Sequence, residues 1–371
     1  MENLKKIKVA IVHDFLVQRG GAERVLESIS EMFPDAPIYT LLYDKEKMRG
    51  MLEERDIRPS YLQKLPKFLR KRYQWLLPFL VVIPETLDLR DFDLIISSSG
   101  AWSKGIVTKL DTVHVAYIHS PMRFVWDYNE RYLKEKKVRN SMLKRLMFSY
   151  LRIWDRLAAE RPDFLIANSK FTQSQIAKYY RRESAVIYPP VEISASASKK
   201  SSEKIKDYFL VVSRLSGYKK TDVIVEAFNK LGLPLVVIGE GEQEKHLRNI
   251  AGENVKILSW KADEELAEYY RGARAFVFAS QEDFGMAPVE AMCFGVPVVA
   301  YRSGGALETV VEGVSGEFFD AQTPEVLADG VRRFLEKENS HDRDEIKRSA
   351  EKFSKERFKE EFGTYIGRIL N

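Results

Sequence analysis

The stretch that most constrains the fold lies between two apolar runs in the second half of the chain. Residues 275–279 and 296–301 are short and apolar, which is typical of buried strands. Between them, Pro288 occupies a position where a helix is expected to begin, because the missing N–H of proline costs nothing in a first turn. Gly295 is expected to end that helix, and Pro297 prevents its continuation. The segment is therefore predicted to form a strand–loop–helix–strand unit.

Two carboxylates flank the predicted start of this helix. Glu282 lies in the loop, and Glu290 follows after seven intervening residues. Gly285 lets the loop bring backbone N–H groups to the helix N-terminus, a place that favours anions and polar ligands. Carboxylates accept hydrogen bonds from hydroxyl groups, so this pair suits a sugar or a ribose. Each glutamate alone is equally well explained as a solvated loop residue or a partner of the helix dipole.

The string Ser-Gln-Glu-Asp-Phe-Gly-Met-Ala-Pro-Val-Glu-Ala-Met-Cys-Phe-Gly, residues 280–295, resembles the signature of retaining glycosyltransferases of family four. The resemblance implies an α/β fold of the GT-B type, in which two Rossmann-like domains face each other across a deep cleft. It also implies that Glu290 holds the ribose hydroxyls of a nucleotide sugar. The residues that it assigns to the donor sugar are Glu282, Phe284, Gly285 and Met286.

The length of 371 residues fits two domains better than one ordinary core. Residues 191–206 are poor in apolar side chains, as expected of a flexible linker. We therefore place an N-terminal, acceptor-binding domain at 1–190 and a nucleotide-sugar-binding domain at 207–352. Residues 353–371 are predicted to form a helix which, by the same resemblance, packs back on the first domain.

In the first domain, two polar features follow predicted strands. Gly20 and Gly21 come between the strand at 7–13 and a helix, so the backbone there can approach a ligand closely, although the full dinucleotide fingerprint is absent. His119 follows the strand at 113–118, and ligands of open α/β sheets bind beyond the carboxyl ends of strands. A single histidine is more often structural than functional.

The resemblance decides between these interpretations. It extends to Ile-His-Ser-Pro-Met-Arg-Phe-Val-Trp-Asp, residues 118–127, which is similar to the branch containing bacterial polysaccharide mannosyltransferases. By this resemblance, His119 contacts the donor sugar as a catalytic residue, and Gly20 and Gly21 lie near the donor phosphates. Arg123 is assigned as an acceptor contact.

In the second domain, Arg214 and Lys219 follow the predicted strand at 208–213. Two cations at a strand end suit a diphosphate, although basic loops are also common on protein surfaces. The resemblance assigns both to the donor diphosphate and, with Glu282, to catalysis. The family has a glycine near Ser259; its absence, beside Trp260, leaves the identity of the base open.

Charge is unevenly distributed along the chain. Residues 1–190 hold 33 basic and 23 acidic side chains, whereas the remainder holds 26 and 31. This asymmetry suggests that the first half meets an anionic partner, or simply has a solvated basic surface. We expect no nucleic-acid partner, because no nucleic-acid-binding module is recognisable. Segments 64–83 and 131–161 mix basic with aromatic and aliphatic residues, which indicates either binding to an anionic membrane surface or amphipathic helices on the domain.

The sequence offers little for metal or cofactor chemistry. Cys293 is the single cysteine, so neither an intrachain disulfide nor a cysteine cluster is possible. No apolar run is long enough to span a membrane and none resembles a signal peptide, so we expect a cytoplasmic protein. If the basic–aromatic segments bind a membrane, the protein is peripheral on the inner face of the cell membrane. The resemblance implies a metal-independent, retaining hexosyltransferase that uses GDP-mannose and a saccharide acceptor, with a lipid-linked acceptor favoured by the basic–aromatic segment.

Other functions remain open at this point. A nucleotide-sugar epimerase or a phosphorylase can share this architecture, although no pyridoxal phosphate lysine or separate phosphate site is evident. A non-catalytic nucleotide-sugar-binding protein, or a membrane-associated scaffold of the same fold, is the alternative outside catalysis.

Overall fold

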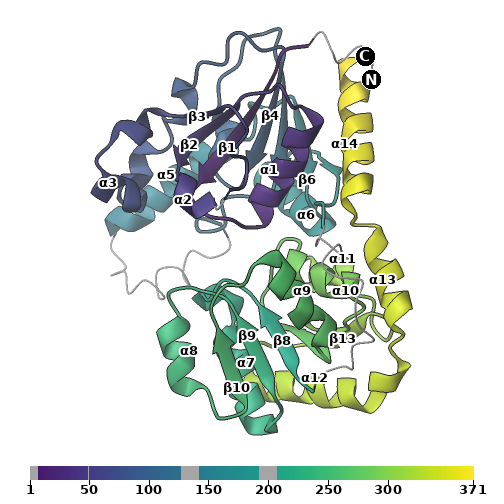
Figure 1. Ribbon diagram of the computed structural model, residues 1–371. Helices are drawn as coiled ribbons and strands as arrows, with labels where there is room; N and C mark the ends of the chain where they lie inside the picture. The colour runs from purple at the N-terminus through teal and green to yellow at the C-terminus, as the bar shows by residue number, and fades with distance from the viewer. Residues whose placement is uncertain (1–6, 49, 127–141, 192–206) are drawn as a thin grey trace. The chain divides into compact units, whose positions relative to one another are not determined.

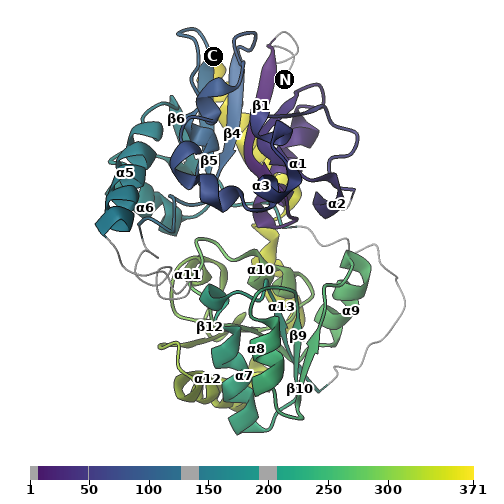
Figure 2. The ribbon, with the colours of Figure 1, turned by 90° about the vertical axis from the view of Figure 1, so that its left-hand side faces the viewer.

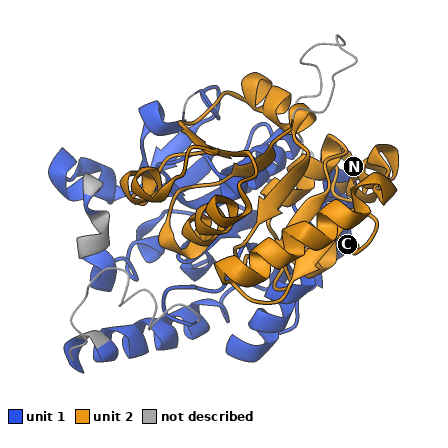
Figure 3. Ribbon diagram, turned by 90° about the horizontal axis from the view of Figure 1, so that it is seen from below, with its two compact units in different colours: residues 1–190, 358–371 blue, residues 191–357 orange. Residues whose placement is uncertain are grey.

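The chain divides into two compact units in the computed structural model, which describes residues 7–48, 50–126, 142–191 and 207–371. Unit 1 comprises residues 1–190 and 358–371, and unit 2 comprises residues 191–357 (Figure 3). Each unit is built on its own parallel sheet with helices packed against it. The prediction of an α/β fold with two Rossmann-like domains is therefore confirmed.

The sheet of unit 1 has the strand order β3-β2-β1-β4-β5-β6-β7, and its neighbouring strands are parallel (Figure 1). The order reverses between β1 and β4, which is where open sheets of this kind bind ligands. Its strands are β1 (Val9–Leu16), β2 (Ile38–Tyr43), β3 (Ile57–Pro59), β4 (Leu94–Ser99), β5 (Val113–Ile118), β6 (Phe164–Ala167) and β7 (Ala185–Val186).

The helices of unit 1 place one apolar face on this sheet. In α1 the side chains of Val25, Leu26 and Ile29 are buried, at the spacing of one helix face. The α-helices are α1 (Gly21–Met32), α2 (Lys45–Met48), α3 (Lys67–Lys71), α5 (Met142–Ala158), α6 (Lys170–Tyr179) and α14 (Lys355–Leu370). The 3-10 helices are η2 (Tyr61–Lys64), η3 (Tyr73–Phe79), η4 (Pro84–Thr86) and η5 (Ser103–Gly105).

The C-terminal helix α14, yellow in Figure 1, contributes to the core of unit 1. Phe358, Phe362 and Ile366 recur every four residues and are fully buried in the same cluster as Ile11 of β1. The Tyr117 ring of β5 meets the Phe358 ring edge-on, with 6.0 Å between centroids. The last turns of the chain therefore complete a core begun by its first strand.

The sheet of unit 2 has the order β10-β9-β8-β11-β12-β13 and again reverses, between β8 and β11. Figure 2 labels its neighbouring strands β9 and β10. Its strands are β8 (Phe209–Val212), β9 (Leu235–Ile238), β10 (Val255–Leu258), β11 (Ala275–Phe278), β12 (Val298–Tyr301) and β13 (Gly316–Phe319). Its helices are η6 (Gly217–Lys219), α7 (Thr221–Leu231), α8 (Glu244–Ile250), α9 (Asp263–Gly272), α10 (Met286–Cys293), α11 (Ala306–Thr309), α12 (Pro324–Lys337), η7 (Glu338–Ser340) and α13 (Arg343–Glu351).

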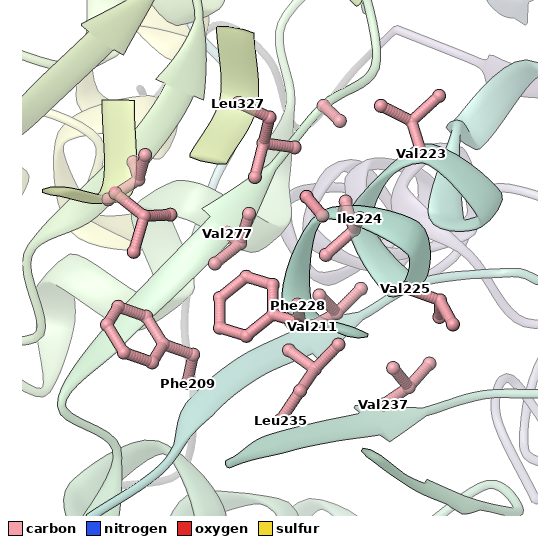
Figure 4. Packing of buried hydrophobic residues seen from close by; sticks show 14 of the residues in the cluster. Phe209, Val211, Val223, Ile224, Val225, Phe228, Leu235, Val237, Val277 and Leu327 are labelled. Carbon is pink, nitrogen blue, oxygen red and sulfur yellow. The ribbon is translucent and has the colours of Figure 1, made fainter. Parts of the chain in front are cut away.

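The core of unit 2 lies between this sheet and the helices α7 and α12 (Figure 4). Phe209 of β8 packs edge-on against Phe228 of α7, with ring centroids 5.0 Å apart. Leu235 of β9 and Leu327 of α12 are buried in the same cluster. Because these apolar side chains come from neighbouring strands and two helices, their packing holds α7 and α12 on the sheet.

Several local expectations need correction. Helix α10 begins at Met286, so Pro288 is its third residue, still within the first turn where no N–H is needed. Gly295 ends that helix as predicted, with φ +72°. Of the helix expected over residues 131–161, the structure describes α5, Met142–Ala158. Residues 127–141 and the linker 192–206 lie outside the described residues. Within the described part of the chain, no helix has the length and apolar character needed to cross a membrane.

Candidate functional site

The strand reversal of unit 2 brings two of the predicted site residues together. Because β8 and β11 are neighbours, the loops that follow them meet at the same edge of the sheet. Lys219, from the loop after β8, donates a hydrogen bond to Oε1 of Glu282, from the loop after β11. The hydroxyl of Ser280 donates to the same oxygen at 2.9 Å. The side chains of Lys219 and Glu282 are 15% and 17% exposed, so they remain accessible to a ligand.

Arg214 is exposed in the same loop as Lys219. Two glycines of the loop after β9 lie directly against the backbone beside it. A Cβ on Gly239 would lie 1.9 Å from the carbonyl oxygen of Ser213, and one on Gly241 would lie 2.2 Å from that of Leu215. These two contacts require glycine, and they fix the path of the backbone that carries Arg214.

A second pair of glycines supports the loop of Glu282. Gly304 has φ +65°, and a Cβ there would lie 2.3 Å from the carbonyl oxygen of Glu282. Gly305 donates its N–H to that oxygen at 2.9 Å, and a Cβ on Gly305 would lie 2.3 Å from the backbone of Phe284. The sequence shows only a glycine turn at this point, so the support that it gives to Glu282 is evident from the structure alone.

The remaining residues of this loop act through their backbone. Gly285 has φ +83° and immediately precedes α10, whose first residue is Met286. The side chain of Phe284 is buried and packs edge-on against Phe353, with 5.3 Å between ring centroids. Only the backbone of Phe284 is therefore suited to contact a ligand, as is the backbone at Gly285.

Glu290 lies within α10 and is 6% exposed. Its Oε2 accepts a hydrogen bond from the hydroxyl of Tyr270 at 2.9 Å. The Tyr270 ring in turn stacks on Phe294, with centroids 5.5 Å apart. Tyr270 therefore orients the carboxylate of Glu290, a role that nothing in the sequence around residue 270 indicates.

Unit 1 places His119 in a chain of buried polar groups at the carboxyl ends of β1, β4 and β5. Nε2 of His119 is 2.7 Å from Oγ of Ser98, and the same Oγ is 3.0 Å from Nδ1 of His13. The other ring nitrogen of His13 lies 3.8 Å from Oε1 of Glu23, on α1. His13, Ser98 and Glu23 are buried, whereas His119 is half-buried at the end of the chain of contacts.

The environment of His119 favours its neutral form. Burial, together with the neighbouring His13, lowers the pKa of the His119 imidazole to about 3. At neutral pH the ring is therefore an uncharged hydrogen-bonding group. The side-chain amide of Asn168 donates to the carbonyl oxygen of His119 at 2.9 Å, which fixes the backbone at this strand end.

Asp14, at the end of β1, shapes the loop that follows β4. Its two carboxylate oxygens accept backbone N–H groups at distances of 2.6–3.0 Å, from Gly100, Ala101, Trp102 and Ser103. Such a carboxylate holds the loop as a rigid turn beside the polar groups of β4. Asp14 was not among the predicted site residues.

A buried ion pair holds the segment that follows His119. Nζ of Lys104 lies 2.5 Å from Oδ1 of Asp155, and both side chains are almost fully buried. Oδ2 of Asp155 accepts from Nε1 of Trp126 and from the hydroxyl of Tyr180, each at 2.8 Å. Burial and the adjacent Asp155 raise the pKa of Tyr180 well above its usual value. Asp155 therefore connects α5 to the segment that carries Arg123.

The predicted residues are thus distributed over both units. Gly20 and Gly21 lie at the start of α1, and His119 and Arg123 lie after β5, all in unit 1. The residues assigned to the diphosphate, sugar and ribose lie in unit 2: Arg214, Lys219, Glu282, Phe284, Gly285, Met286 and Glu290. Among the residues that the structure describes, no group of three or more His, Cys, Asp or Glu side chains is placed to hold a metal ion. Metal independence stays a prediction.

Two known domain families match the chain almost end to end. Residues 19–195 match the family described as Glycosyltransferase Family 4, and residues 193–353 match Glycosyl transferases group 1. The chain has the two domains of a GT-B glycosyltransferase. The first of these domains lies mainly in unit 1 and the second in unit 2.

Two relatives in sequence are themselves named as sugar transferases. An uncharacterized glycosyltransferase of Methanocaldococcus jannaschii is 23% identical over 330 residues, 86% of each chain. The alpha-1,3/1,6-mannosyltransferase ALG2 of Homo sapiens is 24% identical over 271 residues, 62% of this chain and 65% of ALG2. The structure of Anabaena HepE with UDP-glucose superimposes with a TM-score of 0.71 at 20% identity, covering 98% of this chain and 100% of HepE. This last likeness shows the shared fold.

Proposed function

We propose that this glycosyltransferase transfers a hexose from a nucleotide sugar to a saccharide acceptor with retention of the anomeric configuration. The observation that carries the proposal is the contact between Lys219 and Glu282 at the strand reversal of unit 2. A cation suited to a diphosphate and a carboxylate suited to sugar hydroxyls lie side by side at the edge where such sheets bind ligands.

The donor diphosphate would be bound by Arg214 and Lys219. An ammonium group has three N–H donors, so Lys219 can hold Glu282 and a phosphate oxygen together. As the glycosidic bond breaks, negative charge grows on the leaving diphosphate, and fixed cations stabilise it without requiring a metal. Glu282 would accept from sugar hydroxyls, and Glu290, oriented by Tyr270, from the ribose.

We further propose a front-face reaction. The acceptor hydroxyl attacks the anomeric carbon on the side that the diphosphate leaves, and its proton passes to a departing phosphate oxygen. His119, neutral because its pKa is lowered, would contact the sugar as a hydrogen-bonding group. A trapped covalent glycosyl–enzyme intermediate would contradict this scheme.

Mannose from GDP-mannose is our proposed donor. Its support is the resemblance of residues 118–127 to polysaccharide mannosyltransferases and the name of the relative ALG2. The exposed Trp260, after β10, lies beside Ser259, near which the family has a glycine that reads the base. A thermal-shift and hydrolysis screen over GDP-, UDP- and ADP-sugars tests the donor. If none of these nucleotide sugars binds, the proposed function is refuted.

Two substitutions separate the proposed roles within unit 2. Glu282→Ala should abolish transfer, by at least a hundredfold, while the affinity for the nucleoside diphosphate changes little. Arg214→Ala should instead weaken that affinity roughly tenfold or more, because a charge-assisted hydrogen bond is lost. Transfer rates and calorimetric titrations measure both. Glu253→Ala and Arg332→Ala, at exposed positions of the same unit, are the matched controls.

A lipid-linked acceptor, reached at an anionic membrane surface, is the further part of this proposal. Helix α5 exposes an apolar row with the alternating three- and four-residue spacing of one helix face: Leu143, Leu146, Tyr150, Ile153 and Leu157. Arg145 and Arg156 are exposed on the same helix. An apolar row with basic neighbours suits the interface of a bilayer that contains anionic lipids.

Vesicle co-sedimentation tests this surface. The double variant Leu146→Gln/Ile153→Gln should reduce binding to phosphatidylglycerol vesicles several-fold, and high salt should reduce it further. Leu110→Gln, at a fully exposed leucine of the same unit, should bind as the unaltered protein does. Equal binding by all three proteins, or binding that ignores the lipid charge, would rule out α5 as the membrane surface.

A further inference from the structure

A cavity of about 350 Å³ lies in unit 1 at the carboxyl ends of β1 and β2. Val17 borders it just after β1, and Leu42 and Tyr43 border it at the end of β2. Helices α2, η2 and α3 supply the rest of its wall. The carboxyl edge of a parallel sheet is where α/β proteins bind ligands, and this volume is in the range of small-molecule sites. None of the residues assigned above to the donor lines it.

The wall of this cavity carries an excess of positive charge. Its basic side chains are Lys45, Lys47, Lys67 and Arg70, and its acidic side chains are Asp44 and Glu46. The carboxylate of Asp44 is already engaged within the wall. It lies 4.0 Å from Nζ of Lys47 and accepts the backbone N–H of Lys47 at 3.3 Å. Lys47 is in turn paired with Asp44, and Nζ of Lys45 lies 3.4 Å from Oε1 of Glu53, outside the wall. The charge that favours an anionic occupant therefore comes mainly from Lys67 and Arg70.

The buried Nε of Arg70 gives the clearest indication of the chemistry of that occupant. This nitrogen has no hydrogen-bond partner within the described chain. A buried N–H of this kind is rare in native proteins, and a guanidinium presents it in a fork that matches phosphate oxygens. Lys67 precedes Arg70 by three residues on α3, which places both on one side of the helix.

The wall that carries this pair is held firmly against β2. The side-chain amide of Gln63, in η2, donates to the carbonyl oxygen of Tyr43 at 2.9 Å and accepts its N–H at 3.1 Å. Ser60, just before η2, donates to the carbonyl oxygen of Leu41 at 2.8 Å. The residues leading into α3 are thus fixed along the strand before any ligand arrives.

We propose that this cavity binds a phosphate or diphosphate group of the acceptor, with Arg70 and Lys67 as its main contacts. The inference rests on the proposed function, because it assigns a place to the acceptor of that reaction. The same chemistry is present in a free sugar phosphate and in the diphosphate that joins a saccharide to a lipid. The row of exposed apolar side chains on α5 is a separate feature and carries none of this argument.

Calorimetric titration of the full chain tests the site. Each protein carries Arg214→Ala and Lys219→Ala, so that the proposed donor site does not bind the probe. Inorganic pyrophosphate should then bind, and Arg70→Gln and Lys67→Gln should each weaken it tenfold or more. Arg90→Gln, at an exposed arginine of the same unit, removes the same charge and should leave the affinity unchanged. Undetectable binding, or equal loss in Arg70→Gln and Arg90→Gln, would overturn the proposal.

Two further measurements complete the test. Glucose 1-phosphate and farnesyl diphosphate in detergent micelles represent the free and the lipid-linked sources, and the one whose affinity falls more in Arg70→Gln identifies the source. Lys67 is exposed, so Lys67→Gln should leave the folding of unit 1 unchanged. The pyrophosphate affinity of Lys67→Gln therefore tests the assignment even if Arg70→Gln destabilises unit 1. Nucleotide-sugar binding by chains with intact Arg214 and Lys219 is measured separately, so failure of this cavity and failure of the proposed function give different results.

Discussion

At the scale of single residues, a buried histidine couples the stability of unit 1 to pH. His114 of β5 is fully buried, and burial, with the charges of Arg182 and Arg161, lowers its pKa to about 3. The unfolded chain has a histidine pKa of about 6.5 and therefore takes up a proton that the folded chain refuses. The contribution to stability is complete above pH 6.5 and is lost as the pH falls toward 3.

The expected loss from His114 is about 2 kcal/mol in the free energy of unfolding between pH 7 and pH 5. Urea unfolding followed by tryptophan fluorescence measures it, since four of the five tryptophans lie in residues 1–190. His119, whose pKa is also lowered to about 3, should add a similar loss, so His114→Gln should remove about half of the measured difference. His246→Gln, at an exposed histidine of unit 2, should retain all of it. An undiminished pH dependence in His114→Gln would show that His114 is not one of its sources.

The residue scale also shows what a sequence can reveal about a site. Lys219 and Glu282 are predictable because both follow apolar strands and the family resemblance assigns a role to each, and the structure joins them. Tyr270 and Asp14 are not predictable in this way. Their roles arise from contacts with Glu290 and with a backbone loop, made by residues distant in sequence and without a local pattern.

At the scale of elements, strand composition explains which strands the sequence predicts. β5 is an apolar run for most of its length, and its bounds are those predicted, 113–118. β3 contains Arg58 and Pro59, and β13 contains Gly316 and Glu317, so neither shows an apolar run and both were missed. Both lie at sheet edges, where fewer apolar contacts are needed.

The contact between two loops of unit 2 gives a prediction at this scale. Gly304→Ala would place a Cβ 2.3 Å from the carbonyl oxygen of Glu282, so the loop of Glu282 must move. Gly313 has a similar φ, +78°, but a Cβ there meets nothing within 4 Å. Both substitutions should cost about 1 kcal/mol in stability from the left-handed backbone.

Only the first substitution should impair the donor site. Gly304→Ala is expected to lower transfer activity by at least tenfold. Gly313→Ala should retain the activity of the unaltered protein when both variants are compared at the same folded fraction. Steady-state transfer and thermal denaturation of the two variants, measured together, separate displacement of the loop from backbone strain. Equal activities in both variants would show that the glycine turn does not position Glu282.

At the scale of the whole molecule, the two units differ in how they are assembled from the chain. Unit 2 is continuous, from residue 191 to residue 357, whereas unit 1 needs residues 358–371 in addition to its first 190. A sequence shows an amphipathic C-terminal helix, but its partner surface is formed only when distant strands have come together. The family resemblance, and not the helix pattern, supplied that expectation.

The discontinuity of unit 1 predicts a selective loss of stability. Phe362 of α14 is fully buried in the core of unit 1, so Phe362→Ala should cost about 3–5 kcal/mol there. Calorimetry should show one unfolding transition for each unit, of which one moves to lower temperature. Tryptophan fluorescence should assign the shifted transition to unit 1. Nucleoside diphosphate binding, which we propose depends on Arg214 and Lys219 of unit 2, should persist at temperatures below that transition. Glu360→Ala, exposed on the same helix, should shift neither. If Phe362→Ala lowered the unfolding temperature of both units together, the two units would unfold as one. The core that contains α14 would then not unfold independently of unit 2.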